Sequence, residues 1–522
     1  METQHPPDPA NRRALAALGL VCAATSAVIV STWGWTHWDF GDGNYLYVGR
    51  RINDGLVPYR DILAPQPPLH LLTSAWSQRA GKLLGLGDLL GARAFSLVVR
   101  MAQAVLVYLC AARLFGGAWR GVLAATVHLW LPIGFWWSLC MQSENLEIVF
   151  LLLAFLGILS LSRRGVLWGG AASALAMHCN MTAVPYFLVN LLFLACRRRD
   201  LAGWYVLAGL GAWGIGAAAT WAWCGPAYMQ NVVLNQTGSF PRADILALSG
   251  QTQLGYFWGK VSSQGMNVLT LEGMWIALAL GAMALRAREA RGLADDPRHR
   301  WEFAIWSALG MMLSIGFTMK GGTVDYIFVL GEPAVALFGA DGLWRLARAV
   351  LPRPRELATT RFSRTLPLVQ AIAAVALLAF LALHPRAVGH VRLTLAEQQA
   401  ELPSWEVDRV RAIHAPGHTR GHCVLHVEPE DVLYLGDIDL SSFGPYYGDA
   451  WSSLEDFERT LASVRTIEAR WYATFHHVGV VEGRAAFRER LDRFAAVIGT
   501  REARLVEFLA EPRTMDEIVA HR

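Results

Sequence analysis

Charged residues are scarce in this chain of 522 residues. Only 17% of the residues are charged, whereas 54% are hydrophobic, and the formal net charge is +4. An ordinary soluble domain carries about 25% charged residues, and 522 residues exceed the usual length of one domain. The basic residues stand in short clusters between apolar runs, which does not predict a nucleic-acid surface. The composition therefore excludes a single large soluble domain and predicts a polytopic membrane protein.

Cysteine is also rare. The seven cysteines include no CxxC pair, and six of them lie in or beside apolar segments. This spacing predicts neither a zinc knuckle nor a disulfide framework. We expect the cysteines to be small buried side chains.

Apolar runs long enough to cross a bilayer recur over the first 390 residues. The first run, Ala14 to Trp33, follows Arg12 and Arg13 and predicts an uncleaved anchor with a cytoplasmic amino terminus. With basic clusters placed inside, we expect about eleven transmembrane helices in the cell membrane, the inner or plasma membrane, and everything after His384 outside. The further expected spans are 94–112, 121–139, 146–161, 166–179, 186–196, 201–224, 268–285, 303–319, 326–344 and 366–383, with an interfacial helix at 69–84.

The stretch from Trp38 to Leu69 is unusually polar for a segment next to a membrane span. It contains four aspartates, three arginines and a cluster of prolines. The letters DGNYLYVGRRI have helical periodicity, and DG, PYRD and PQPP are typical of rigid turns. The alternative is an ordinary solvated loop.

This pattern resembles the first extracytoplasmic loop of the C-type glycosyltransferases, membrane enzymes akin to protein mannosyltransferases and lipid A aminoarabinose transferases. That family has an early aspartate, a tyrosine-bearing helix, a PYRD-like turn and a Pro-Pro pair. The matching residues here are Asp42, Tyr45, Tyr47, Gly55, Pro58, Tyr59, Arg60, Asp61, Pro67 and Pro68. Many members have glutamate after the aspartate, where this chain has Gly43, so the matching carboxylate is Asp42 or Asp39; we favour Asp42.

Two further segments carry the same resemblance, which covers roughly residues 13–384. The turn CMQSEN contains Glu144, and KGGTVDYIFVLGEP contains Lys320, Tyr326 and Pro333. In the family such segments line the donor cavity from the far side. The alternative for Glu144 and Lys320 is a solvated or snorkelling charge at a span end.

The resemblance implies a membrane glycosyltransferase that takes a sugar from a polyprenyl-phosphate donor and passes it to a lipid, glycan or protein acceptor. The resemblance implies that this transferase requires no cofactor and has no nucleic-acid partner. A carboxylate would take the proton of the acceptor hydroxyl, and Asp42 is the candidate base. Arg60 or Lys320 would stabilise the leaving phosphate. The candidate substrate-binding residues are Asp39, Tyr45, Arg60, Asp61, Glu144, Lys320 and Tyr326.

From about Trp405 the sequence changes from apolar runs to charged residues mixed with alternating apolar and polar ones, which predicts a soluble α/β module. VRAIHAPGHTRGHCVLHV, EDVLYLGDIDL and ARWYATFHHVGVV predict strands, and ERTLASV and FRERLDRFAAVI predict amphipathic helices. This resembles the second half of the metallo-β-lactamase fold. The resemblance implies metal ligands at His418, Asp437 and one of His476 or His477, with zinc or iron as the metal.

The HxHxDH string of that family's first half is absent from the chain. We therefore expect a partial, inactive module rather than a working hydrolase, produced by a gene fusion or a gene-model join near residues 402–408. The expected domains are a membrane glycosyltransferase-like domain at 1–390, a linker at 391–404, the partial module at 405–500 and the start of a winged-helix-like tail at 501–522.

Two other functions remain as alternatives. A transporter for a lipid-linked sugar would show charges buried in mid-span and paired repeats. The sequence indicates neither, apart from His128 and His178, which we expect to be packed histidines. A membrane-tethered metallohydrolase would need ligands that the chain lacks.

Overall fold

The computed structural model divides into two compact units, Met1–Glu401 and Leu402–Arg522. The structure describes residues 9–31, 40–62, 64, 66–234, 252–318 and 325–350, and from 410 to 518 all but 420, 429, 449–451, 476–477 and 515–516.

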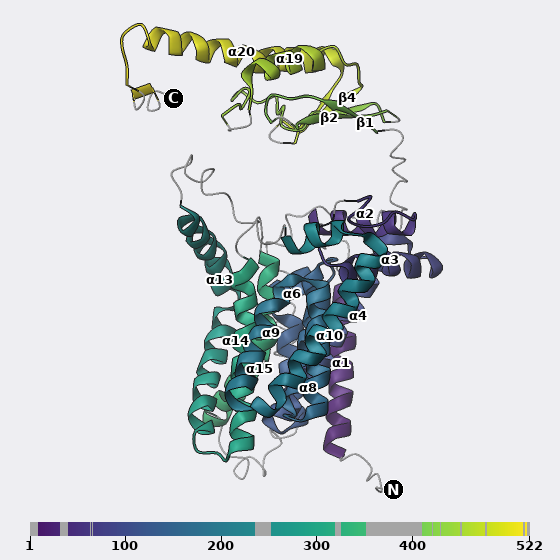
Figure 1. Ribbon diagram of the computed structural model, residues 1–522, viewed down its shortest axis with the longest axis vertical. Coiled ribbons are helices and arrows are strands. Elements are labelled where there is room, and N and C mark those ends of the chain that lie inside the picture. The colour runs from purple at the N-terminus through teal and green to yellow at the C-terminus, as the bar shows by residue number, and fades with distance from the viewer. Residues whose placement is uncertain are drawn as a thin grey trace. The chain divides into compact units, whose positions relative to one another are not determined.

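The first unit is built of helices (Figure 1). They are α1 (Pro9–Ser31), α2 (Phe40–Asn53), α3 (Pro68–Leu83), α4 (Gly87–Phe115), α5 (Ala118–Trp130), α6 (Pro132–Trp137), α7 (Ser143–Leu159), α8 (Arg163–Cys179), η2 (Met181–Ala183), α9 (Val184–Arg197), α10 (Arg199–Cys224), η3 (Met229–Leu234), α13 (Gln253–Ala290), α14 (Asp295–Thr318), η4 (Asp325–Leu330) and α15 (Glu332–Val350).

Within the described part of the chain, four helical segments are long and apolar enough to cross a membrane. They are Asn11–Val30, Gly87–Phe115, Arg199–Cys224 and Val268–Ala290. Large apolar side chains of α10, such as Leu207 and Ile215, are exposed, as lipid-facing side chains are in a bilayer. The larger number of spans expected from the sequence stays a prediction, and the expected span 366–383 lies outside the described residues.

Proline divides two of the expected spans. The run 121–139 is not one helix, because α5 ends at Trp130 and α6 begins at Pro132. Pro132 has no N–H to continue the helix, and Leu131 before it takes an extended ψ of 126°. The separate expected spans 166–179 and 186–196 correspond to α8, which ends at Cys179, and α9, which begins at Val184 just before Pro185.

Helices α7 and α8 pack closely through glycines. A Cβ on Gly157 of α7 would lie only 2.6 Å from the carbonyl oxygen of Gly165, and one on Gly169 of α8 would lie 2.5 Å from the side chain of Ile158. Small residues at such contacts let helix backbones approach in a membrane. Replacing them would push the two helices apart.

The second unit is a five-stranded sheet with two helices on one face (Figure 1). Its elements are β1 (Val410–His414), β2 (Cys423–Val427), β3 (Val432–Tyr434), α19 (Leu454–Val464), β4 (Trp471–Ala473), β5 (Val480–Glu482) and α20 (Arg484–Phe508). The strands lie in chain order; β3 and β4 are parallel, joined through α19, and the other neighbours are antiparallel. The expected segments contain these strands and helices, but ARWYATFHHVGVV forms two strands, β4 and β5, where one was expected, and α20 continues past residue 500, where we expected a boundary.

Side chains of the sheet alternate between its two faces. Leu433 and Tyr472 are buried among residues of α19 and α20, and the ring of Tyr472 stacks on Phe487 with 3.8 Å between centroids. The intervening Val432, Tyr434 and Trp471 are only half-buried on the opposite face. This side of the sheet has no helix over it within the described residues.

Candidate active site

The predicted helix of the first loop is α2, and it is fixed on α3. Ser74 Oγ donates a hydrogen bond of 2.7 Å to the carbonyl of Tyr45, and Gln78 Nε2 donates one of 2.8 Å to that of Leu46. Gly49 makes this approach possible, because a Cβ there would lie 2.5 Å from Ser74 Oγ. Buried polar side chains of α3 thus hold the backbone of the helix that begins the first loop.

The PYRD turn is a compact structure centred on Tyr59. Tyr59 has a φ of 66°, unusual for a residue with a side chain, and its N–H donates to Ile62 O at 2.9 Å. Its hydroxyl donates to Gln66 O at 2.7 Å, and its ring lies 5.5 Å from that of Tyr228. Burial raises the pKa of Tyr59, so the phenol is a neutral hydrogen-bond donor.

Arg60 and Asp61 of the same turn are paired with each other. Arg60 donates from Nε and Nη2 to the two Asp61 oxygens at 2.9 and 2.8 Å. Asp61 Oδ2 also accepts from the backbone N–H of Val57 at 2.8 Å. These hydrogen bonds, with that to Arg60 largest, lower the pKa of Asp61 to about 2. Asp61 is therefore a turn-forming carboxylate, and the charge of Arg60 is already matched.

The first loop packs on the CMQSEN turn and on the chain after α10. Arg93 of α4 donates from Nη1 to Leu139 O at 2.6 Å at the start of that turn. One apolar cluster unites the three segments, with Tyr45, Leu46, Val48, Tyr59, Ile62, Ala64, Leu71, Leu89, Ala92, Met141, Cys224, Tyr228 and Val232 as its buried members. The structure thus brings together the first-loop motif and the CMQSEN motif.

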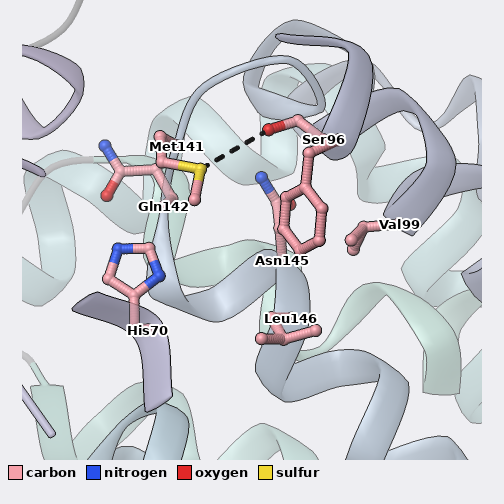
Figure 2. Close-up of a pocket in the computed structure, with 8 residues that line it drawn as sticks. His70, Ser96, Val99, Met141, Gln142, Asn145 and Leu146 are labelled. Atoms are coloured by element: carbon pink, nitrogen blue, oxygen red, sulfur yellow. Dashed lines mark hydrogen bonds between the residues drawn. The ribbon is translucent and has the colours of Figure 1, made fainter. Parts of the chain in front are cut away.

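A small hollow of about 10 Å³, room for about one water molecule, lies between α3, α4 and the start of α7 (Figure 2). It is lined by His70, Phe95, Ser96, Val99, Met141, Gln142, Asn145 and Leu146. Figure 2 shows Ser96 Oγ facing the sulfur of Met141, a contact of 4.0 Å. Pockets for whole ligands measure about 300–1,000 Å³, so this hollow by itself does not hold a substrate.

His70 borders the hollow as a neutral imidazole. It is buried, and its ring meets that of Tyr45 edge to face at 4.3 Å. Burial lowers its pKa to about 3, although a hydrogen bond with the backbone of Met141 opposes the shift. Its Nε2 is buried without a hydrogen-bond partner in the described part of the chain. His70 was not singled out in the sequence, and it can offer this nitrogen to a polar ligand group.

Glu144 is buried at the start of α7 and belongs to an acidic pair. Its Oε1 accepts from Asn180 Nδ2 at 3.0 Å, and its Oε2 accepts from Ser143 Oγ at 3.1 Å. One turn further, the buried Glu147 accepts from Thr182 Oγ1 at 2.6 Å. The alternative of a solvated Glu144 is wrong, and its role in lining a donor cavity stays a prediction. Glu147 was missed, although its spacing of three residues from Glu144 indicates the same helix face.

A second set of buried charges lies between α4, α6, α13 and α15. Arg100 Nη1 lies 3.3 Å from Glu332 Oε2, and Arg100 Nη2 donates to His128 O. Glu332 accepts from the backbone N–H of Gly134, and Glu272 accepts from that of Ile133 at 3.1 Å. The expectation that no charge is buried in mid-span is wrong. The sequence feature that indicates a buried charge here is Arg100 itself, an arginine inside the apolar run 94–112.

This charged set supports the floor of the hollow. Arg100 Nη1 donates to Gln103 Oε1 at 3.2 Å, and Gln103 Nε2 donates to Asn145 O. Asn145 in turn donates to the carbonyls of Trp137 and Cys140, each at 3.0 Å. The CMQSEN turn is therefore held from below by side chains within the helix bundle.

Four of the predicted transferase residues are not placed as side chains. Asp39 and Lys320 lie outside the described residues. Asp42 lies in α2 and Tyr326 in η4, but only their backbones are described. The roles of all four stay predictions.

Two of the four candidate metal ligands of the second unit lie close together. His418 Nε2 is 3.7 Å from Asp437 Oδ2, and His418 Nδ1 is 3.0 Å from Tyr446 O. The nearby His422 is structural, because Nδ1 lies 2.8 Å from Ala415 O and Nε2 accepts from the Asp437 N–H. Burial lowers the pKa of His422.

The described residues do not by themselves complete a site for zinc or iron. His476 and His477 lie outside the described residues. Among the residues that are described, no group of three or more His, Cys, Asp or Glu side chains is arranged to hold a metal ion. One histidine and one carboxylate are fewer ligands than a stable zinc or iron site uses.

Fold and site together define a helical membrane protein joined to an α/β unit. No protein-family model matches the sequence, and no curated protein matches it. Similar solved structures include ArnT from Cupriavidus metallidurans bound to undecaprenyl phosphate, with 15% identity and a TM-score of 0.47 over 69% of this chain and 64% of that one. They also include the Archaeoglobus fulgidus oligosaccharyltransferase in the apo form, with 12% identity and a TM-score of 0.49 over 73% of this chain and 56% of that one.

The oligosaccharyltransferase AglB from Archaeoglobus fulgidus, in complex with an inhibitory peptide and a dolichol-phosphate, has 13% identity and a TM-score of 0.46. This chain covers 56% of its length and therefore spans less than two thirds of each of these structures. At such identities and scores, the likeness establishes neither a family nor an activity for this chain.

Proposed function

We propose that the chain is an integral membrane glycosyltransferase that moves a sugar from a polyprenyl-phosphate donor to an acceptor hydroxyl on the outer face of the membrane. One observation carries the proposal. The first-loop motif and the CMQSEN motif, far apart in the sequence, share one buried cluster beside a small hollow that is bordered in part by His70, Gln142 and Asn145. A lipid-linked donor needs a polar site of this kind beside apolar helices.

In the proposed reaction, Asp42 takes the proton of the acceptor hydroxyl. The acceptor oxygen then forms a bond to the anomeric carbon of the sugar, and the bond from that carbon to the phosphate oxygen breaks. The polyprenyl phosphate leaves with the electron pair, and a cation stabilises its charge. Because Arg60 is paired with Asp61, we favour Lys320 for this role. No metal takes part in this scheme.

The direct test is a vesicle assay. The purified protein would be reconstituted with a polyprenyl-phosphate sugar and an oligosaccharide or lipid acceptor, and both lipid products would be measured. A transferase releases free polyprenyl phosphate in step with glycosylated acceptor. Donor that crosses the bilayer intact, without release of polyprenyl phosphate, would contradict the proposal.

A transporter of lipid-linked sugars is the second candidate, and the buried charges favour it. Arg100, Glu272 and Glu332 lie within the helix bundle, where unsatisfied charges are costly and often functional. Against a transporter, Glu272 and Glu332 accept hydrogen bonds from the backbone N–H groups of Ile133 and Gly134, which is a structural role. The vesicle assay separates the two functions, because only a transporter moves intact donor.

For the second unit we propose a metallo-β-lactamase-like half-module without hydrolase activity. This proposal is supported by the lack of an HxHxDH string in the sequence. The full chain is expected to bind less than one tightly held zinc or iron ion and to hydrolyse neither β-lactams nor thioesters. Stoichiometric binding of two metal ions would contradict this.

A further inference from the structure

Arginines from three helices gather at one end of the bundle, away from the hollow. Arg120 begins α5, Arg286 lies near the end of α13, and Arg345 and Arg348 lie in the last turns of α15. The common centre is Asp341 of α15, whose side chain is fully buried. The transferase mechanism uses none of these residues.

Asp341 fixes two of the guanidinium groups rigidly. Arg286 donates from Nε and Nη2 to the two Asp341 oxygens at 2.9 and 2.8 Å, and Arg345 Nε donates to Oδ2 at 2.9 Å. Arg345 also makes a two-pronged pair with Glu289, at 2.8 Å for each bond. The carboxylates of Asp341 and Glu289 are therefore already paired with Arg286 and Arg345.

Positive charge remains in excess after this pairing. Arg120 is 3.9 Å from Asp341 Oδ1, and Arg348 has no acidic partner within the described part of the chain. Among the described residues of this cluster, four guanidinium groups therefore face two carboxylates, Asp341 and Glu289. Burial lowers the pKa of Arg120, Asp341 opposes the shift, and Arg286, Arg348 and Arg345 lower the pKa further. This surplus of cations would be stabilised by an added anion.

Trp344 lies close to both Arg120, which also donates a hydrogen bond of 2.7 Å to Phe115 O, and Arg348. The guanidinium carbons of Arg120 and Arg348 are 5.6 and 5.5 Å from the centre of its ring. Its Nε1 is buried without a hydrogen-bond partner in the described residues. Tryptophan is enriched at the membrane–water boundary, where its apolar ring and polar N–H meet both media. The indole therefore offers a third donor beside two guanidinium groups.

We propose that Arg120, Trp344 and Arg348 bind the phosphate of an anionic phospholipid head group. Guanidinium groups bind phosphate with paired, charge-assisted hydrogen bonds. A lipid is favoured over free phosphate because Leu346 and Leu285, on the same two helix ends, expose 51% and 49% of their surface, which suits acyl chains. By the positive-inside rule this end faces the cytoplasm, whose leaflet carries anionic lipids.

The test uses the full-length protein in detergent, incubated with equal amounts of phosphatidylglycerol and phosphatidylcholine. Intact-complex mass spectrometry then measures which lipid stays bound. Phosphatidylglycerol should be retained preferentially, and the double variant Arg120→Gln/Arg348→Gln should lower its retention by about ten- to thirtyfold, since each arginine near a membrane surface contributes about 1 kcal/mol. The matched control is Arg164→Gln/Arg199→Gln, which removes two arginines predicted on the same side but outside the cluster.

Each outcome decides the proposal. Equal retention of the two lipids, or an equal loss in the control variant, would overturn it. Displacement of the lipid by inorganic phosphate at millimolar concentration would show a free-anion site and contradict the lipid. Should the double variant unfold, Arg348→Gln, at an exposed residue with no acidic partner in the described part of the chain, gives the same test with a severalfold loss expected.

Discussion

Arg100 and Glu332 form an ion pair of 3.3 Å inside the helix bundle, although 232 positions separate them in the chain. Their side chains are 1% and 0% exposed. The pair joins α4 to α15, and Glu332 extends the link to α6 through the N–H of Gly134. It therefore fixes the base of the segment that leads into the CMQSEN turn.

Removing one partner of this pair should destabilise the protein strongly. Glu332→Gln or Arg100→Gln leaves an unpaired charge in an apolar environment, and such changes cost about 3–5 kcal/mol. The double variant Arg100→Gln/Glu332→Gln should cost less than the sum of the single changes, because neither charge remains. Thermal unfolding in detergent measures all three, with Arg300→Gln as an exposed control. Additive single effects would show that the pair is not coupled.

Gly49→Ala should displace α2 from α3. The added methyl would meet Ser74 Oγ, Gln78 Nε2 and the backbone nitrogen of Ala75 within 2.9 Å. Such overpacking costs about 1–3 kcal/mol. We expect a lower unfolding temperature and a loss of transfer activity. Gly19→Ala in α1, which meets nothing within 4 Å, is the control and should be neutral or slightly stabilising. Equal behaviour of the two variants would contradict the close approach of α2 and α3.

His70 should make stability depend on pH. Its pKa is about 3 in the folded protein and 6.5 ordinarily. Between these values the unfolded imidazole binds a proton and the folded one does not, so the free energy of unfolding falls as the pH falls through this window. The contribution is fully present above the ordinary pKa. His70→Gln cannot titrate, so its unfolding temperature should fall less than that of the natural protein between about pH 7 and pH 4.5.

The control for His70 is His414→Gln, on an exposed position of β1. It should keep the full pH dependence of the natural protein. Identical slopes for the natural protein and His70→Gln would show that the imidazole is not held neutral by burial.

Topology can be tested separately with reporter fusions. The basic clusters predict that a reporter fused after Arg199 is cytoplasmic and that one fused after Gly389 is external. An accessibility or enzymatic reporter assay in whole cells distinguishes the two sides. A cytoplasmic reporter after Gly389 would mean that the expected number of spans is wrong by one.

Local features of the fold were predictable because their causes are local. The helix of the first loop follows from its periodicity, and the break near Pro185 follows from proline chemistry. The strands of the second unit follow from alternating side chains. The division at Pro132 was missed because 121–139 is apolar throughout, which hid the break in a continuous run.

The buried polar contacts were less predictable because they depend on tertiary packing. Arg100 is visible in its apolar run, but nothing in the sequence identifies Glu332 as its partner. In the sequence, His70 is one polar residue in a weakly apolar helix. Its burial becomes visible only in the structure, where Tyr45 and Met141 pack around the imidazole. Asp61 was predicted only as a substrate-binding residue, and its contacts within the turn could not be read from the sequence.

The most direct measurement is the transfer rate of Asp42→Asn. Asparagine keeps the shape of the side chain but cannot accept the proton, and general-base catalysis contributes about a hundred- to ten-thousand-fold in rate. Transfer from a polyprenyl-phosphate sugar should fall by that factor while protein level and membrane insertion stay normal. Asp61→Asn, a change at a turn-forming carboxylate, and Asp39→Asn should cost far less. Full activity in Asp42→Asn with loss in Asp39→Asn would move the base three residues back, and full activity in both would contradict the transferase mechanism.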